Sequence, residues 1–221
     1  CRESGVSLQI SHLKANNPEN WDKLDRVLEL IHDAAQEGLP VNADRYPYIA
    51  YSTGLSIFLP LWSLQGDTGD LMARLNDPAQ LPGIMEYVEQ RGRRIGGWER
   101  VVISSCFSES GKKWEGRSIL ECSEEARLTP LEFVRTILLQ EENRVQIVGF
   151  GMNEENLKKV LSSPLVMAGS DGNAVAPYGK LGEGKPHPRY YGTFPRILGR
   201  YVREEKLFDL STAIRKMTSM P

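Results

Sequence analysis

The sequence has few cysteines, no long apolar run and almost no net charge, and each shortage removes a class of protein. Its three cysteines, Cys1, Cys106 and Cys122, are odd in number and widely spaced, which indicates neither a disulfide framework nor a structural zinc site. No apolar run approaches the roughly 18 to 20 residues of a membrane span. A net charge of −2 gives no reason to expect nucleic acid or an anionic membrane as a partner.

Targeting signals and nucleotide-binding signals are missing as well. The chain shows no charged and apolar leader typical of a signal peptide, and no Gly-rich fingerprint follows its first apolar run. The sparse cysteines favour a reducing cytoplasm. The chain opens at Cys1 without an initiator Met and stops at Pro221 just after an amphipathic segment, so we expect a piece of a larger protein.

What the sequence does contain is an alternation of short apolar runs and amphipathic segments, in a chain of 221 residues with 40% hydrophobic content. Residues 6–11 predict a buried strand. Asn17, Pro18 and Glu19 are typical of a helix start, and apolar residues then recur at helical spacing to residue 35. Residues 41–43 predict the next strand, so this part reads as a parallel βαβ unit.

The same alternation continues further along the chain. It predicts strands at residues 101–105, 146–150 and 164–168, and helices starting at residues 129, 153, 194 and 210. Residues 59–98 break the pattern with many Gly and Pro, and we expect an inserted, irregular segment there. Repeated parallel βα units favour an α/β fold that is part of a (β/α)₈ TIM barrel over a doubly wound sheet.

Two of the predicted strands run directly into residues that can carry chemistry. His12 follows the first strand and is either a metal ligand or a hydrogen-bonded structural histidine, while Lys14 leaves the chain on the same side. Asp171 follows residues 164–168 in a Gly-flanked turn, where a carboxylate can serve as metal ligand or general base. Arg189, on the Pro-stiffened loop that follows, can hold an anionic substrate over Asp171.

A second cluster, Asp44 to Tyr48 with Ser52 close behind, follows residues 41–43. Tyr46 and Tyr48 flank Pro47 and form either rigid aromatic walls with hydroxyl donors or a strand-exit turn that only caps the core. We expect Cys106 to be a buried structural thiol, because no histidine is near it in sequence. The remaining polar candidates are expected to be structural or surface residues: His32, Asn42 and Arg196.

Taken together, four motifs resemble those of the N-acyl-D-amino-acid deacylases (D-aminoacylases) of the amidohydrolase superfamily. The most specific is His-Pro-Arg-x-x-Gly-Thr-Phe-Pro-Arg, and the order and spacing fit across essentially the whole chain. The four stand at residues 10–14, 43–48 with 52–53, 169–172 and 187–196.

The resemblance implies a metal-dependent hydrolase barrel, an N-acyl amino acid as the small-molecule partner, and roles for particular residues. His12 looks like a ligand of the catalytic zinc. Asp171 resembles the aspartate that activates the attacking water beside that zinc, as base and metal ligand. Lys14, Tyr46, Ser52 and Arg189 align with residues that hold the substrate's carboxylate or its scissile carbonyl.

The resemblance also implies one tightly bound zinc ion, with room for a second, weaker site. The family's other metal ligands would precede Cys1, and its small β-domain is built from both chain ends. We therefore expect residues 1–221 to be the C-terminal part of the barrel and inactive alone. Two other hypotheses remain open at this point. One is a cyclic-amide hydrolase of the hydantoinase or dihydroorotase type, and the other is a non-catalytic protein that keeps the fold.

Overall fold

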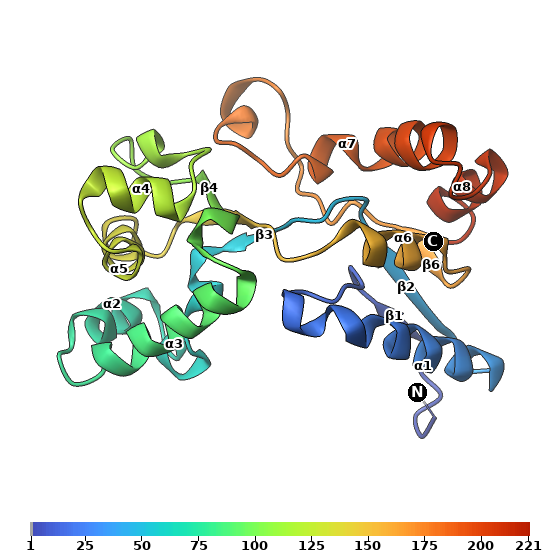
Figure 1. The fold of residues 1–221 in the computed structure, drawn as a ribbon, viewed down its shortest axis with the longest axis horizontal. Coiled ribbons are helices and arrows are strands. Elements are labelled where there is room, and N and C mark those ends of the chain that lie inside the picture. Colours follow the sequence, from blue (N-terminus) through green and yellow to red (C-terminus); the bar gives the residue numbers. More distant parts are fainter. Residues whose placement is uncertain (1) are drawn as a thin grey trace. The chain divides into compact units, whose positions relative to one another are not determined.

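The computed structural model describes residues 2–221, which form two compact units (Figure 1). The first unit consists of the chain up to Ile49 together with Met152–Val175 and Pro188–Pro221. The second unit consists of Ala50–Gly151 and Ala176–His187. Each unit has its own sheet and its own hydrophobic core, so each is described by itself.

The first unit is built on a parallel sheet of three strands in the order β1-β2-β6. β1 spans Leu8–Ile10, β2 spans Val41–Arg45 and β6 spans Val166–Ala168. Leu8 is paired with Val41, and Ala43 with Val166, so all three strands end at the same edge of the sheet. That shared edge positions the polar residues that follow each strand.

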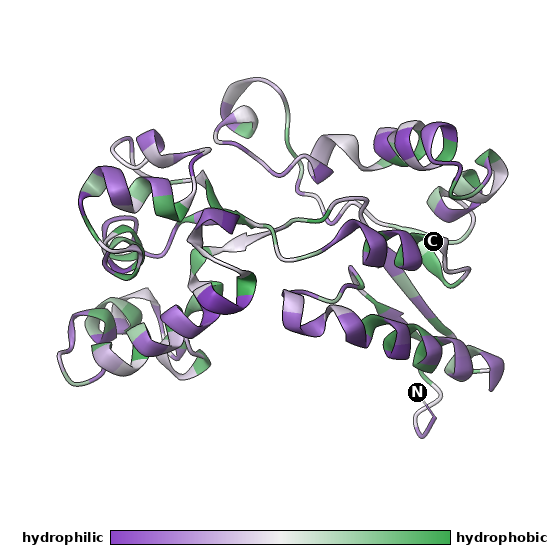
Figure 2. Ribbon diagram, viewed as in Figure 1, coloured by the Kyte–Doolittle hydropathy of each residue, from purple (hydrophilic) through white to green (hydrophobic). Residues whose placement is uncertain are grey.

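Helices cover this sheet because their apolar residues recur at helical spacing. A 3₁₀ turn, Pro18–Lys23, leads into α1 (Leu24–Gln36), and Leu24 and Ile31 of α1 pack with Ala43 and Val166 of the sheet. The other helical segments of this unit are α6 (Glu154–Ser162), α7 (Arg189–Arg196), a π-helical continuation (Ile197–Glu204) and α8 (Leu210–Met217). Figure 2 shows that these helices carry both hydrophilic and hydrophobic residues.

The second unit is built on an antiparallel sheet of three strands in the order β3-β5-β4. β3 spans Tyr51–Gly54, β4 spans Val101–Ser105 and β5 spans Gln146–Gly149. Four α-helices accompany the sheet: α2 (Thr68–Asn76), α3 (Leu81–Ile95), α4 (Ile119–Ala126) and α5 (Pro130–Gln140). Short 3₁₀ turns connect them at Leu55–Phe58, Leu61–Leu64, Trp98–Arg100 and Lys112–Trp114, and a further one, Gly179–Gly182, lies in the segment Ala176–His187.

The structure confirms the βαβ unit of β1, α1 and β2, and the α/β class of the chain. The expectation that residues 101–105 and 146–150 are parallel strands of a barrel is wrong, because β4 and β5 pair antiparallel with each other. Strand direction is set by which strands pair across the sheet, and the alternation of strands and helices along the chain does not contain that information. The sequence pattern missed α4, which packs against α5 in the connection from β4 to β5. The segment at residues 59–98 falls inside the second unit, and the expectation that it is irregular is wrong, because it contains α2 and the 15-residue α3.

No helix within residues 2–221 is both long enough and apolar enough to cross a membrane.

The second unit offers a matched pair of helical glycines in α3. A Cβ on Gly92 would stand 2.5 Å from the indole of Trp98, which also packs against Phe58, whereas a Cβ on Gly83 would meet nothing within 4 Å. We expect Gly92→Ala to destabilise the protein by about 1–3 kcal/mol through overpacking, and Gly83→Ala to stabilise it by about 0.5–1 kcal/mol. Urea unfolding of both variants measures this, and equal effects would contradict the packing described here.

Candidate active site

The carboxyl ends of β1, β2 and β6 each deliver polar side chains to one edge of the sheet in the first unit. His12 comes two residues after β1, Asp44 lies near the end of β2, and Asp171 comes three residues after β6. Parallel strands place such residues at the same edge, where α/β proteins bind their ligands. The structure therefore brings the ends of three separate segments to one place.

His12 and Asp171 share an uncommon backbone conformation. Their φ angles are 44° and 47°, in the left-handed region that residues other than Gly seldom adopt. Such residues cost of order 1–3 kcal/mol each and persist where their surroundings hold them, often at functional sites. Both residues were predicted as site residues at strand ends, and both therefore need support from their surroundings to keep this conformation.

Asp44 holds the backbone of His12 in place, a role that the sequence pattern did not predict. Its Oδ1 accepts a hydrogen bond from the His12 backbone N–H at 2.8 Å, and its Oδ2 accepts one from Nε2 of Gln9 at 3.0 Å. The Leu13 N–H donates to the Asp44 carbonyl oxygen at 2.9 Å. A Cβ on Gly169 would lie 3.0 Å from Asp44 Oδ1, so this glycine leaves room for the carboxylate. The position of Asp44 on a strand beside β1 was the available signal.

Lys14 contacts both the imidazole ring and the backbone carbonyl of His12. Its Nζ lies 2.8 Å from His12 Nδ1 and donates to the His12 carbonyl oxygen at 3.0 Å. Burial lowers the pKa of Lys14 to about 8, and the positive charges of Arg45 and Arg189 act in the same direction. This contact occupies Nδ1 and leaves Nε2 as the ring nitrogen for any further ligand. His12 and Lys14, which were predicted to leave the chain on the same side, are therefore in direct contact.

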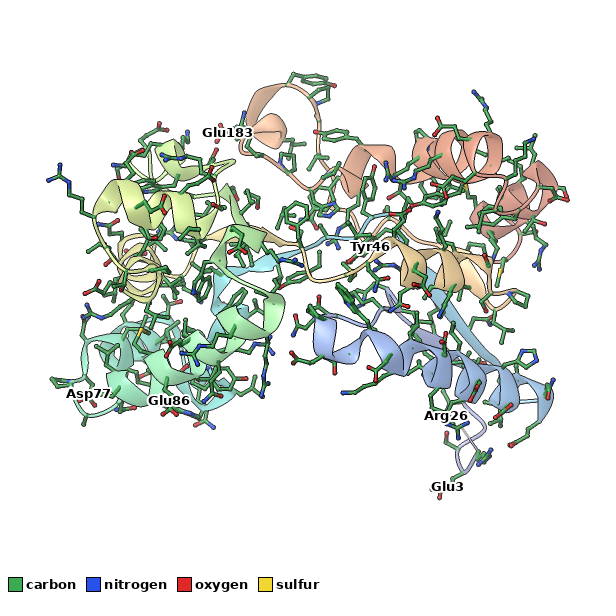
Figure 3. The ribbon with its side chains drawn as sticks, in the orientation of Figure 1. Glu3, Arg26, Tyr46, Asp77, Glu86 and Glu183 are labelled. Atoms are coloured by element: carbon green, nitrogen blue, oxygen red, sulfur yellow. The ribbon has the colours of Figure 1, made fainter. Side chains whose placement is uncertain are left out.

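Tyr46 is fully buried, and its ring is surrounded by cations. The guanidinium carbons of Arg45 and Arg189 lie 4.2 Å and 4.7 Å from the ring centroid, and Nζ of Lys14 lies at 5.7 Å. All three distances are within the range of cation–π attraction. Figure 3 labels Tyr46 within a dense group of side chains. The tyrosine thus links three basic residues that are distant in sequence.

Arg189 forms an ion pair with Asp171, with 2.6 Å between Nη1 and Oδ2. The side chain of Arg189 is 5% exposed and that of Asp171 is 37% exposed, so the arginine is buried and the carboxylate can be reached from solvent. The prediction that Arg189 lies on a loop before a helix starting at residue 194 is wrong: α7 begins at Arg189, and this helix sets the position of the guanidinium. The two residues that the sequence paired across a long loop do meet in the structure.

The other candidates are distributed differently. Ser52 lies half-buried on β3 of the second unit. Burial raises the pKa of the Cys106 thiol to about 12, as expected for a structural cysteine, and that of Cys122 to about 11. His32 is on the exposed side of α1, within 2.9 Å of Gln36 Nε2. Cys1 lies outside the described residues.

A metal ion would find only part of its ligand set in this chain. Within residues 2–221, no group of three or more His, Cys, Asp or Glu side chains is arranged to hold one. His12 and Asp171 are exposed and carry nitrogen and oxygen donors of the kind zinc prefers, but a catalytic zinc site uses three protein ligands. The donor chemistry fits zinc, and the number of donors does not complete a site.

Comparisons with known proteins agree on one family. No family model matches the chain. It is 41% identical over 219 residues to N-acyl-D-aspartate deacylase and 28% identical over 220 residues to N-acyl-D-glutamate deacylase, both from Alcaligenes xylosoxydans xylosoxydans. These alignments take in 99% and 100% of the chain, but only 34% and 35% of the two relatives.

Solved structures give the same result. N-acyl-D-glutamate deacylase from Bordetella bronchiseptica, complexed with zinc and a phosphonate inhibitor that mimics the tetrahedral intermediate, matches with a TM-score of 0.72 and 26% identity. The match covers 100% of this chain and 36% of that one. A D-aminoacylase that defines a subset of amidohydrolases matches with a TM-score of 0.66 and 28% identity, over 99% of this chain and 36% of that one.

Over essentially its whole length the chain is therefore similar to N-acyl-D-amino-acid deacylases of the amidohydrolase class, the resemblance that its motifs predicted. It spans about a third of the length of the relatives it matches.

The anchoring role of Asp44 can be tested directly. Asp44→Ala removes the acceptor of the His12 N–H, and a hydrogen bond to a charged group contributes about 1.5–3 kcal/mol, so amide exchange at His12 should accelerate about tenfold or more. Asp44→Asn keeps an oxygen acceptor and serves as the control. Exchange at His12 that is unchanged in Asp44→Ala would show that the loop is held in another way.

Proposed function

We propose that the protein hydrolyses the amide bond of N-acyl-D-amino acids and releases a carboxylate and a free D-amino acid. In this proposal the chain supplies the C-terminal part of a (β/α)₈ barrel. The observation that carries it is the convergence of Lys14, Tyr46, Asp171 and Arg189 around the shared edge of β1, β2 and β6. The comparisons support the substrate class, since the named activities of the relatives are deacylations of N-acyl-D-amino acids.

Zinc is the metal that suits this reaction. His12, through Nε2, and Asp171 would hold it from this chain, with further ligands from outside residues 2–221. When bound, zinc supplies an activated water and polarises the amide carbonyl.

Asp171 acts as the general base and then as the general acid. Its carboxylate is partly exposed and lies at the sheet edge, where it can accept the proton of the attacking water. The water oxygen bonds to the carbonyl carbon, and the carbon–nitrogen bond then breaks. Asp171 passes its proton to the leaving nitrogen, which departs as the amine of the amino acid.

The basic residues bind the carboxylate of the substrate. Arg189 has the planar fork of donors that matches a carboxylate, and Lys14 adds a second cation from the end of β1. Tyr46, between these cations, contributes a hydroxyl donor to the scissile carbonyl. Ser52 is assigned to substrate binding, at the carboxylate or the scissile carbonyl, from its motif alone.

The activity is tested with the full-length protein and zinc on N-acetyl-D-aspartate, N-acetyl-D-glutamate and N-acetyl-D-leucine. We expect turnover of at least one of these and much slower turnover of the L-enantiomers. Hydantoin serves as the second substrate class. Turnover of hydantoin without turnover of the linear substrates would favour a cyclic-amide hydrolase, and turnover of neither would favour a non-catalytic protein.

Asp171→Asn tests the base. General acid–base catalysis contributes about 10²- to 10⁴-fold, so kcat should fall by about that factor or more. The asparagine keeps an oxygen donor and the other ligands remain, so the bound zinc, measured by atomic absorption, should stay largely unchanged. Asp33→Asn, on the exposed side of α1, is the matched control. Normal turnover in Asp171→Asn would refute its role.

Residues 1–221 alone are expected to be inactive with the same substrates and zinc, because two donors do not complete a zinc site. Turnover by this chain in isolation, above that of the Asp171→Asn form of the same chain, would contradict the proposed division of the site.

A further inference from the structure

Two arginines hold the turn that presents Tyr46. Arg45 directly precedes Tyr46 in the sequence, whereas Arg196 lies far along the chain. The turn follows β2, and the Tyr48 N–H donates to the Tyr46 carbonyl oxygen at 3.0 Å. Arg45 donates from Nη2 to the Tyr48 carbonyl oxygen at 2.7 Å, and Arg196 donates from Nε to the Pro47 carbonyl oxygen at 2.7 Å. Each arginine therefore satisfies one backbone carbonyl of the same three-residue turn.

Each of these arginines also packs on one tyrosine of the turn. The guanidinium carbon of Arg45 lies 4.2 Å from the Tyr46 ring centroid, and that of Arg196 lies 4.9 Å from the Tyr48 ring centroid. A cation over a ring face is attracted to it, most strongly where water is excluded. The two arginines thus contact both the backbone and the two tyrosine rings of the turn.

Arg45 is the more unusual of the two because it is 1% exposed. Within residues 2–221 no carboxylate forms an ion pair with it, Nη2 also donates to the sulfur of Met152 at 3.0 Å, and its side chain hydrogen-bonds with Tyr46. A buried guanidinium without an anionic partner is expensive. An apolar residue at this position on β2 would avoid that cost but could not donate to the turn, which indicates that the guanidinium has a role there.

Arg196 connects the turn to the opposite end of the helix that carries Arg189. α7 begins at Arg189, which packs on the Tyr46 ring and pairs with Asp171, and it ends at Arg196. Between them, a Cβ on Gly192 would lie 2.3 Å from the Tyr48 hydroxyl, so only glycine lets the phenol of Tyr48 approach the helix this closely. The turn and α7 are therefore fitted to each other at three points.

We propose that Arg45 and Arg196 are positioning residues that clamp the Tyr46–Pro47–Tyr48 turn, fix the phenol of Tyr46 against the substrate and keep α7 in register, so that Arg189 stays beside Tyr46. This inference rests on the proposed function, because Tyr46 and Arg189 are its substrate-binding residues. Neither Arg45 nor Arg196 contacts the substrate in this arrangement, and both act through the turn.

The first test compares Arg45→Met, Arg45→Lys and Lys216→Met in the full-length protein with N-acetyl-D-amino acids. Lys216 is a matched control, because it is a buried cation of the same unit that donates to the carbonyl oxygens of Ser163 and Val166. Misplacement by about 1 Å can cost about 10²-fold, so we expect Arg45→Met to lower kcat/KM about ten- to hundredfold. Lys216→Met should leave it within about threefold, and Arg45→Lys, which restores a cation near the ring, should lie between.

A double-mutant cycle with Tyr46→Phe separates positioning from general destabilisation. If Arg45 acts through the Tyr46 hydroxyl, Arg45→Met should cost less than about threefold in the Tyr46→Phe background. Equal costs in both backgrounds would overturn the proposal, as would a Lys216→Met variant that loses as much activity as Arg45→Met. If Arg45→Met does not fold, Arg196→Met, at a half-buried position, takes its place in the same cycle.

Amide exchange at Tyr48 provides a measurement independent of turnover. The proposal requires faster exchange of this amide in Arg45→Met and unchanged exchange in Lys216→Met. A wild-type protein without deacylase activity but with this exchange pattern would refute the proposed function and leave the clamp intact. An active wild type whose Tyr48 exchange and kcat/KM are both unaffected by Arg45→Met would refute the clamp.

Discussion

The parallel pairing of β1, β2 and β6 is the constraint on which the candidate site depends. It aligns three strand ends that come from residues 10, 45 and 168 of the chain, so that the residues just beyond them meet at one edge. A slip of one residue in this register would turn Asp44 away from His12 and exchange the two faces of β2. The buried face of β2, with Val41 and Ala43 against α1, fixes that register through the core.

Around this edge the chain concentrates positive charge on one aromatic ring. Lys14, Arg45 and Arg189 all lie within cation–π distance of Tyr46, and among them Arg189 alone has a carboxylate partner, Asp171, in the ion pairs of residues 2–221. The mutual repulsion is visible in Lys14, whose pKa falls to about 8 through burial first and Arg45 next. A site arranged in this way is complementary to an anion, which agrees with a substrate that carries a carboxylate.

Most of the first unit could be predicted from the sequence, because local patterns determine its elements. α8 has the bounds that its amphipathic spacing predicted, and the βαβ unit follows from strong punctuation at Asn17, Pro18 and Gly38. The second unit was predicted less well, since strand direction depends on which strands pair across the sheet, and α4 was not detected. Arg45 lies within the motif at residues 43–48, but its role could not be predicted, because the burial of a charged side chain on β2 cannot be inferred from alternation alone.

The sequence by itself determined the chemistry available: an imidazole, two carboxylates and several guanidiniums placed next to turns at the ends of apolar runs. It also carried the resemblance to the N-acyl-D-amino-acid deacylases, because the spacing of those motifs is specific. Only the tertiary structure decided which of these groups meet. The contact of Arg189 with Asp171 and Tyr46, and of Arg196 with Pro47, spans long stretches of chain and is set by the docking of α7. Such contacts depend on packing between distant elements, which no local pattern contains.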